Sequence, residues 1–194
     1  MNKLVECLEL FNRKERYWLL QDCLSEQNNL CLSESFCGRL KEKIKVDVPV
    51  DAWWAMDYHL DWLHLAMRQF VMDGDIPEIE ITERKNIEDI DFVVAFENIL
   101  ILIEAKVDES WSNRQLSSKL PRLDKLKSIL SIKAIDQTIK SYNDTKLYFL
   151  LTSPNPPMKI NDKNRQDIAI FNGFGQHEDD SWFKLQSTSK LQRK

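Results

Sequence analysis

No stretch of this 194-residue chain approaches the roughly 20 apolar residues that a membrane-spanning helix requires. The N-terminal segment also lacks a signal-peptide core, because Glu6, Glu9 and Arg13 interrupt its apolar residues. We therefore expect a soluble, cytoplasmic protein without a membrane partner.

Cysteine and histidine show no metal-binding pattern. The four cysteines lie in the first fifth of the chain without a Cys-x-x-Cys pair, so neither a zinc site nor a disulfide framework is indicated. We interpret them as reduced and mostly buried. His59 and His64 are five residues apart, which excludes the i, i+4 histidine pair of a helical zinc site.

Other familiar patterns are missing as well. No serine lies in a nucleophile elbow, and no internal repeat is present. A Gly-x-Gly occurs at 173–175, but no helix start follows it, and the three acidic residues at 178–180 would repel a phosphate. We predict a loop there.

The net charge of -4 conceals an uneven distribution. Residues 1–110 carry 12 Lys and Arg against 23 Asp and Glu, whereas residues 111–194 carry 15 against 8. A basic region beside an acidic cluster is what a metal-dependent enzyme acting on a polyanion needs, because phosphates attract cations and divalent metals attract carboxylates. The alternative is a charged, solvated face that has no partner.

The pattern of apolar residues predicts a single α/β (α+β) domain over residues 1–194, with a mixed central sheet flanked by helices. We divide it into an N-terminal helical segment (1–50), a core (52–152) and a C-terminal extension (153–194). Pro121 should kink or divide the last predicted helix. Predicted helices cover 2–24, 32–44, 51–73 and 112–130, and predicted strands cover 77–84, 88–96, 99–107, 146–154, 166–171 and 181–186.

The helix at 51–73 has the clearest pattern. Its apolar residues from Trp53 to Phe70 recur at alternating intervals of three and four, Asp51 suits the N-cap, and Gly74 follows its end. Four polar residues would share one face of this helix, which is then solvent-exposed in the simplest interpretation. They are Asp57, Asp61, His64 and Arg68.

The two apolar strands before and after residues 97 and 98 are so close in sequence that they predict a hairpin. A turn at Glu97 and Asn98, continued along both strands, places Asp91 opposite Glu104. Side chains in such a pair have Cβ atoms roughly 4.5–5.5 Å apart, so two carboxylates there repel each other. A positive partner is needed to offset that repulsion.

Lys106 lies on the same face of its strand as Glu104, with Asp89 predicted opposite it. Two carboxylates supply the hard oxygen ligands that Mg²⁺ or Mn²⁺ prefers. A bound metal would activate a water, and Lys106 could orient that water or stabilise charge developing on a phosphorus centre. This interpretation predicts phosphodiester hydrolysis, and the alternative is a set of structural salt bridges at a solvated sheet edge.

The segments "EDID" at 88–91 and "EAK" at 104–106, followed by a helix, resemble the PD-(D/E)xK nuclease superfamily. The resemblance implies a restriction-endonuclease-like core over residues 52–152, with Asp91 and Glu104 binding Mg²⁺ or Mn²⁺ and Lys106 assisting the attacking water. Ile90 replaces the literal motif's proline, as is common in the family. "NRKER", "MDYHLDWL" and "WSNRQL" are similar to segments of small bacterial members.

The same resemblance implies roles for residues on two helices. Many members carry a glutamine or lysine on the helix after the motif, and Gln115 and Lys119 match those positions. Members often present an acidic residue from the helix before the sheet, which Asp61 or Asp57 would match. We therefore predict Gln115 as a catalytic residue and Asp61 as a metal ligand.

The charges of the helix predicted after the hairpin indicate which kind of partner the protein binds. Residues 114–133 carry six cations against one acid. Such a face could follow a nucleic-acid backbone through Arg114, Lys119 and Arg122, and Trp111 could stack on a base. The alternatives are a solvated helix face and a tryptophan wedged into the core.

We therefore predict a Mg²⁺- or Mn²⁺-dependent nuclease with nucleic acid, expected to be DNA, as its substrate. The rival hypothesis is a catalytically silent member of the fold that acts as a nucleic-acid-binding or protein-interaction module. A purely structural domain would instead place Asp91 and Glu104 on opposite faces. The sequence leaves strandedness and oligomeric state open, and it allows a homo-oligomer.

Overall fold

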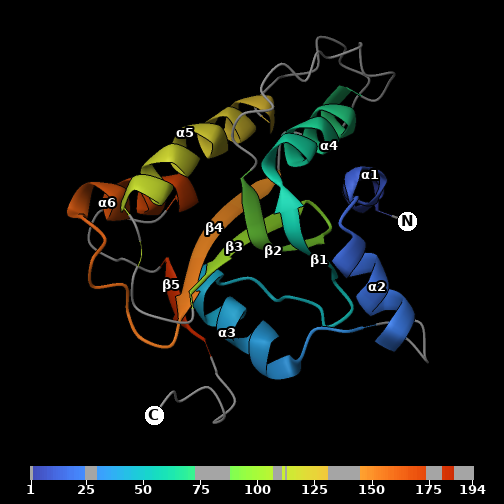
Figure 1. The fold of residues 1–194 in the computed structure, drawn as a ribbon, viewed down its shortest axis with the longest axis horizontal. Coiled ribbons are helices and arrows are strands. Elements are labelled where there is room, and N and C mark those ends of the chain that lie inside the picture. The colour runs from blue at the N-terminus through green and yellow to red at the C-terminus, as the bar shows by residue number, and fades with distance from the viewer. Residues whose placement is uncertain are drawn as a thin grey trace.

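The computed structural model describes residues 2–24, 30–72, 88–106, 111, 113–130, 145–173 and 181–185. These residues form a mixed α/β fold, as predicted (Figure 1). The helices are α1 Lys3–Phe11, α2 Glu15–Leu24, α3 Glu34–Ile44, α4 Leu60–Met72, α5 Asn113–Leu130 and α6 Asp162–Asn172. The strands are β1 Trp53–His59, β2 Asp89–Phe96, β3 Ile99–Ala105, β4 Lys146–Ser153 and β5 Trp182–Lys184.

The five strands form one mixed sheet in the order β1-β2-β3-β4-β5. β1, β2 and β3 are antiparallel neighbours, whereas β4 is parallel to β3 and β5 is parallel to β4. Helix α5 provides the crossover that a parallel β3-β4 pair requires. The predicted mixed sheet flanked by helices is therefore confirmed.

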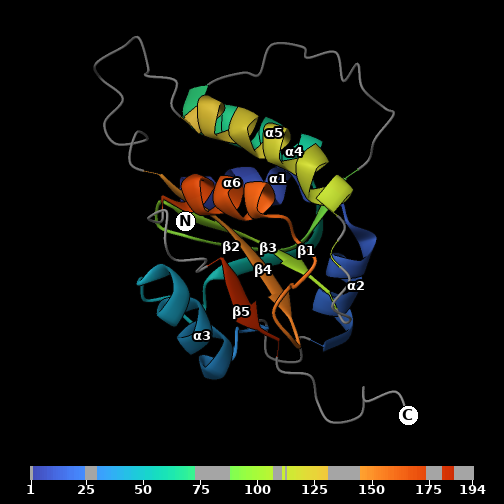
Figure 2. The same ribbon diagram turned by 90° about the vertical axis from the view of Figure 1, so that its left-hand side faces the viewer.

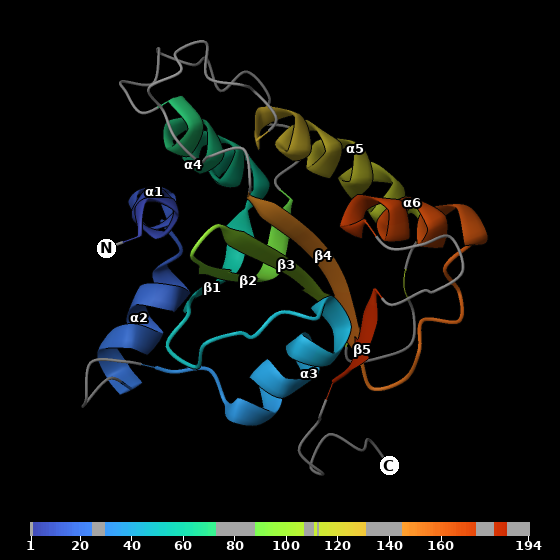
Figure 3. The ribbon, with the colours of Figure 1, turned by 180° about the vertical axis from the view of Figure 1, so that it is seen from behind.

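Helices cover the two faces of the sheet unequally (Figure 2). α1, α4, α5 and α6 lie on one face, and α3 lies across the other, where Figure 3 shows it beside β5. The alternating side chains of β3 supply both cores: Leu100 and Leu102 belong to the larger hydrophobic cluster, and Ile101 and Ile103 to the smaller one. Burial on both faces explains the unbroken apolar run of this strand.

The prediction of one helix over 51–73 is wrong in its first half. Residues Trp53–His59 are strand β1, which pairs with β2, and helix α4 begins only at Leu60. Asp57 has a left-handed backbone (φ 52°) that interrupts the two-residue alternation of the strand. Ala55 and Tyr58, on either side of Asp57, are both buried. Trp53 and Met56 of this strand precede Leu60 of α4 at intervals of three and four, and this spacing imitates a helix.

This correction also divides the predicted polar stripe. Asp57 lies on β1, so it shares no helix face with Asp61, His64 and Arg68 of α4. Tyr58, which is fully buried, donates its hydroxyl to the Leu8 carbonyl oxygen at 2.7 Å and links β1 to α1.

Three other predicted elements differ from the structure. Residues 166–171 are not an edge strand but part of α6, whose N-cap side chain Asn161 accepts from the Asn164 N–H and whose end has Gly173 at φ 73°. The helix predicted over 2–24 is two helices, because α1 ends at its C-cap Asn12. Pro121 lies inside a continuous α5 and does not divide it.

Other predictions are confirmed or lie outside the structure. The strand predicted at 181–186 is observed as β5, and the helix predicted at 32–44 is observed as α3, with Ser33 as its N-cap. The strand predicted at 77–84 and residues 174–180 of the predicted loop lie outside the described residues. In the described part of the chain, no helix has the length and apolar character needed to cross a membrane.

Candidate functional site

A pocket of about 280 Å³ opens where β2 and β3 meet the first half of α5. Seven of its nine lining residues have polar or charged side chains, which distinguishes it from the apolar packing below it. The lining residues are Glu88, Asp89, Asp91, Glu104, Lys106, Trp111, Gln115, Leu116 and Lys119. Six of them are residues that the sequence analysis selected for function.

The hairpin register brings the two predicted metal ligands to this pocket. The predicted pairing is confirmed from the pair Phe96–Ile99, next to the turn, to the pair Phe92–Ile103. Asp91 and Glu104 are the next residues of the two strands, at the end of the hairpin away from the turn. Asp91 leans towards β3, because its Oδ2 accepts a hydrogen bond from the Ala105 N–H at 2.7 Å.

Glu104 is the most deeply buried acid of the pocket, at 5% exposure. Burial, with a further contribution from the negative charge of Asp91, raises the pKa of Glu104 to about 7, although Lys119 opposes the shift. The carboxylate therefore titrates near neutral pH, where an occupant of the pocket can change its charge.

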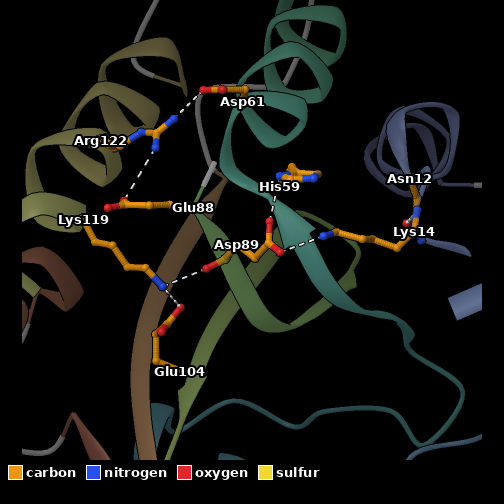
Figure 4. Close-up of polar contacts among 9 residues, drawn as sticks. All are labelled: Asn12, Lys14, His59, Asp61, Glu88, Asp89, Glu104, Lys119 and Arg122. Carbon is orange, nitrogen blue, oxygen red and sulfur yellow. Dashed lines mark hydrogen bonds and ion pairs between the residues drawn. The ribbon is translucent and has the colours of Figure 1, made fainter. Parts of the chain in front are cut away.

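Lys119 points into the pocket rather than away from the helix. Its Nζ lies 2.5 Å from Glu104 Oε1 and 2.7 Å from the Asp89 peptide oxygen (Figure 4). The side chain is only 12% exposed. In the structure Lys119 is therefore paired with oxygens of the pocket, and its contact with nucleic acid stays a prediction.

Lys106 and Trp111 form the other side of the pocket. The ammonium of Lys106 lies 5.8 Å from the centroid of the Trp111 ring, a cation–π contact. Trp111 is 5% exposed and belongs to the larger hydrophobic cluster. Base stacking by this tryptophan is contradicted by its burial, and the alternative interpretation, a wedge in the core, is what the structure shows.

The carboxylate of Asp89 pairs with Lys14 and His59 rather than with Lys106, the residue predicted opposite it. Its two oxygens lie 2.7 Å from the Lys14 Nζ and 2.7 Å from the His59 Nδ1. Burial lowers the pKa of His59, despite the opposing charge of Asp89. Sequence reasoning missed both partners, and nothing in the sequence links Lys14 to a strand 75 residues further on.

Asp61 lies beside the pocket but does not line it. Its Oδ1 accepts a hydrogen bond from Arg122 at 2.5 Å, and Arg122 also lies 3.6 Å from Glu88 Oε2 (Figure 4). Glu88, which the sequence analysis did not select, additionally accepts from the Ser118 hydroxyl at 2.8 Å. The structure thus places Asp61 and Arg122 in an ion-pair network, whereas Arg114 is exposed on α5.

The pocket offers a divalent metal few protein ligands. Among the described residues, no three His, Cys, Asp or Glu side chains are arranged to hold a metal ion. The pocket does contain the carboxylates of Asp91 and Glu104, and Mg²⁺ is commonly held by one or two carboxylates with several waters completing its shell. These donors fit Mg²⁺ or Mn²⁺ and do not fit a closed zinc site.

Comparisons of this chain with models of protein families, with curated proteins and with solved structures find no match.

The raised pKa of Glu104 has a measurable effect on stability. Between its ordinary value of 4.5 and about 7, the folded protein keeps a proton that the unfolded chain has released, so the wild type loses stability as the pH rises through this range. Glu104→Gln removes that loss. The free energy of unfolding of the variant, relative to wild type, should therefore rise by roughly 3 kcal/mol from pH 4.5 to pH 8.

Urea unfolding at a series of pH values tests this expectation. Glu42→Gln, which removes a charge from the exposed face of α3, is the matched control and should change stability by less than about 0.5 kcal/mol. A stability difference between Glu104→Gln and wild type that does not vary with pH would contradict the assignment.

Proposed function

We propose that the protein is a metal-dependent nuclease of the PD-(D/E)xK type, which hydrolyses a phosphodiester bond of nucleic acid, expected to be DNA. One observation carries the proposal: Asp91, Glu104 and Lys106 lie around a single open pocket at the end of the β2-β3 hairpin. A cytoplasmic location and a homo-oligomeric state stay predictions.

The residues of the pocket have distinct roles in this proposal. Asp91 and Glu104 would hold Mg²⁺ or Mn²⁺, which when bound lowers the pKa of a water and neutralises charge on the phosphate. Lys106 would orient the attacking water and stabilise the negative charge that develops during the reaction. Gln115, on the first turn of α5, would donate a hydrogen bond from the opposite wall.

The strand arrangement supports the family resemblance. Three antiparallel strands, a crossover helix and a parallel strand follow one another as β1, β2, β3, α5 and β4. The resemblance implies the order helix, three strands, helix, strand; here α4 lies between β1 and β2, so the agreement covers β2, β3, α5 and β4.

Two of the three cations predicted to contact nucleic acid are already held in ion pairs. Arg122 is engaged by Asp61 and Glu88, and Lys119 is engaged by Glu104. Arg114 is exposed near the pocket at the start of α5. We propose Arg114 as the first cation that a substrate backbone would meet, with salt-sensitive binding as the consequence.

One observation favours the second candidate function, a catalytically silent nucleic-acid-binding or protein-interaction module. Lys119 already places a positive charge on Glu104, so the pocket is partly neutralised without a metal. A module of this kind would bind no Mn²⁺ at the carboxylate pair. Metal binding therefore separates the two candidates.

The proposal predicts Mn²⁺ binding and Mn²⁺-dependent cleavage by the wild type, both lost in Asp91→Asn. The variant removes one of two ligand charges while keeping an acceptor for the Ala105 N–H. Calorimetry measures binding, and end-labelled single- and double-stranded DNA and RNA measure cleavage.

Asp47→Asn is the matched control, because Asp47 is an exposed acid with its side chain 85% accessible. It should bind Mn²⁺ and cleave like the wild type. Cleavage by Asp91→Asn at the wild-type rate would reject the nuclease proposal, and binding of nucleic acid without Mn²⁺ affinity would support the silent module.

A further inference from the structure

Lys119 places an ammonium group directly on the Glu104 carboxylate (Figure 4). Two oxygens converge on its Nζ: Oε1 of Glu104 at 2.5 Å and the peptide oxygen of Asp89 at 2.7 Å. Both side chains of the pair are largely buried. The cation is therefore held by oxygens of both hairpin strands, at the wall of the pocket that faces α5.

A carboxylate oxygen and a peptide oxygen are also the ligands that a hard divalent cation uses. An ion bound to Glu104 would lie on the same carboxylate that Lys119 contacts. Two positive charges so close together repel strongly where little water screens them. Occupation of the pocket by a divalent ion and the present position of Lys119 thus oppose each other.

We propose that Lys119 is a built-in counter-ion of the metal site, which neutralises Glu104 in the metal-free protein and leaves it when a divalent ion binds. The inference rests on the proposed function, because it assigns a regulatory step to the same carboxylate pair. Lys119 lines the pocket, so its released ammonium can pair with a phosphate of the substrate. Metal binding would then prepare the pocket for a polyanion.

Displacement of Lys119 has opposite effects on the two states of the protein. Without metal, loss of the ammonium leaves Glu104 buried beside Asp91 with no counter-ion at its Oε1, which destabilises the fold. With metal, loss of the Lys119 ammonium removes the group that competes with the divalent ion for the Glu104 carboxylate. A merely structural lysine would show the first effect and not the second.

Mn²⁺ titration calorimetry on the full chain tests the proposal with two variants. Lys119→Gln keeps a hydrogen-bond donor but removes the charge, and it should bind Mn²⁺ roughly tenfold more tightly than wild type, in the usual range for coupled binding. Lys119→Arg keeps the charge and should bind like wild type. Without metal, Lys119→Gln should melt at a lower temperature than wild type. Saturating Mn²⁺ should raise the melting temperature of Lys119→Gln by more than it raises that of the wild type.

Lys127→Gln is the matched control, because Lys127 is a half-buried lysine of the same helix that donates to the Phe171 carbonyl oxygen outside this pocket. Its Mn²⁺ affinity should equal that of the wild type. Equal or weaker Mn²⁺ binding by Lys119→Gln, with wild-type binding intact, would overturn the inference and leave the proposed function standing. No Mn²⁺ binding by any of these proteins would reject the proposed function, and the inference with it.

A measurement on the wild type keeps the test independent of variant folding. Acetylation of Lys119 by a soluble amine-reactive ester, followed by mass spectrometry, should increase when Mg²⁺ is added, because the ammonium leaves Glu104. Acetylation of Lys127 serves as the internal reference. Unchanged or reduced labelling of Lys119, at Mg²⁺ concentrations that saturate binding, would overturn the inference.

Discussion

Replacing Lys106 with methionine should lower the rate of Mn²⁺-dependent cleavage by roughly 10²–10⁴-fold and change Mn²⁺ affinity only a few-fold. The ammonium of Lys106 lines the pocket with both carboxylates, where it can act on the attacking water and on the developing charge. Burial dominates the pKa of Glu104, and Lys106 is the weakest of the groups that influence it. Its removal should therefore affect catalysis far more than metal binding.

Methionine keeps the aliphatic stem beside Trp111, and the backbone N–H of residue 106 can still donate to the Thr152 carbonyl oxygen. The variant should therefore fold. Single-turnover cleavage at saturating Mn²⁺ gives the rate, and calorimetry gives the affinity. Lys125→Met, an exposed position on α5, is the control and should cleave at the wild-type rate. Wild-type cleavage by Lys106→Met would remove this lysine from the mechanism.

Replacing Asn172 with alanine should lower the free energy of unfolding by roughly 2–5 kcal/mol, because two buried backbone groups lose their partner. The Asn172 Oδ1 accepts from the Phe149 N–H at 2.6 Å, and its Nδ2 donates to the Phe149 carbonyl oxygen at 2.8 Å. Among the described residues, β5 pairs with β4 at Leu151 to Ser153. The side chain of Asn172 thus supplies to Phe149 the hydrogen bonds that a neighbouring strand would otherwise make.

Urea unfolding measures the change in the free energy of unfolding, and the slope of that free energy against urea concentration should be the same in the variant and the wild type. Asn155→Ala, at an exposed position, is the control and should change stability by less than about 0.5 kcal/mol. A loss below 1 kcal/mol in Asn172→Ala would show that water replaces the amide, and the proposed role in completing the sheet edge would be wrong.

The hairpin could be predicted because its information is local. A short turn at Glu97 and Asn98 and two apolar runs define the register, and a slip by one residue would turn the inward apolar side chains of both strands outward. Asp91 and Glu104 reach the same end of the hairpin as a direct result. The pairing of these strands needs no information from the rest of the chain.

Strand β1 could not be predicted in the same way. Trp53, Met56 and Leu60 follow one another at intervals of three and four, so the sequence pattern across the end of β1 and the start of α4 resembles one helix. Only the pairing with β2, through Trp53 with Ala95 and His59 with Asp89, shows that the segment is extended. Tertiary pairing here overrides local periodicity.

The sequence by itself determined the mixed α/β class, the hairpin register and the presence of two carboxylates and a lysine at one end of that hairpin. Each depends on residues close together in the chain, whose spacing directly sets their geometry. The tertiary structure decided the partners: Lys119 turns inward to Glu104, Lys14 reaches Asp89, and Arg122 holds Asp61 outside the pocket. These contacts join elements 15 to 75 residues apart, and only the packing of α5 and the N-terminal helices against the sheet brings them together.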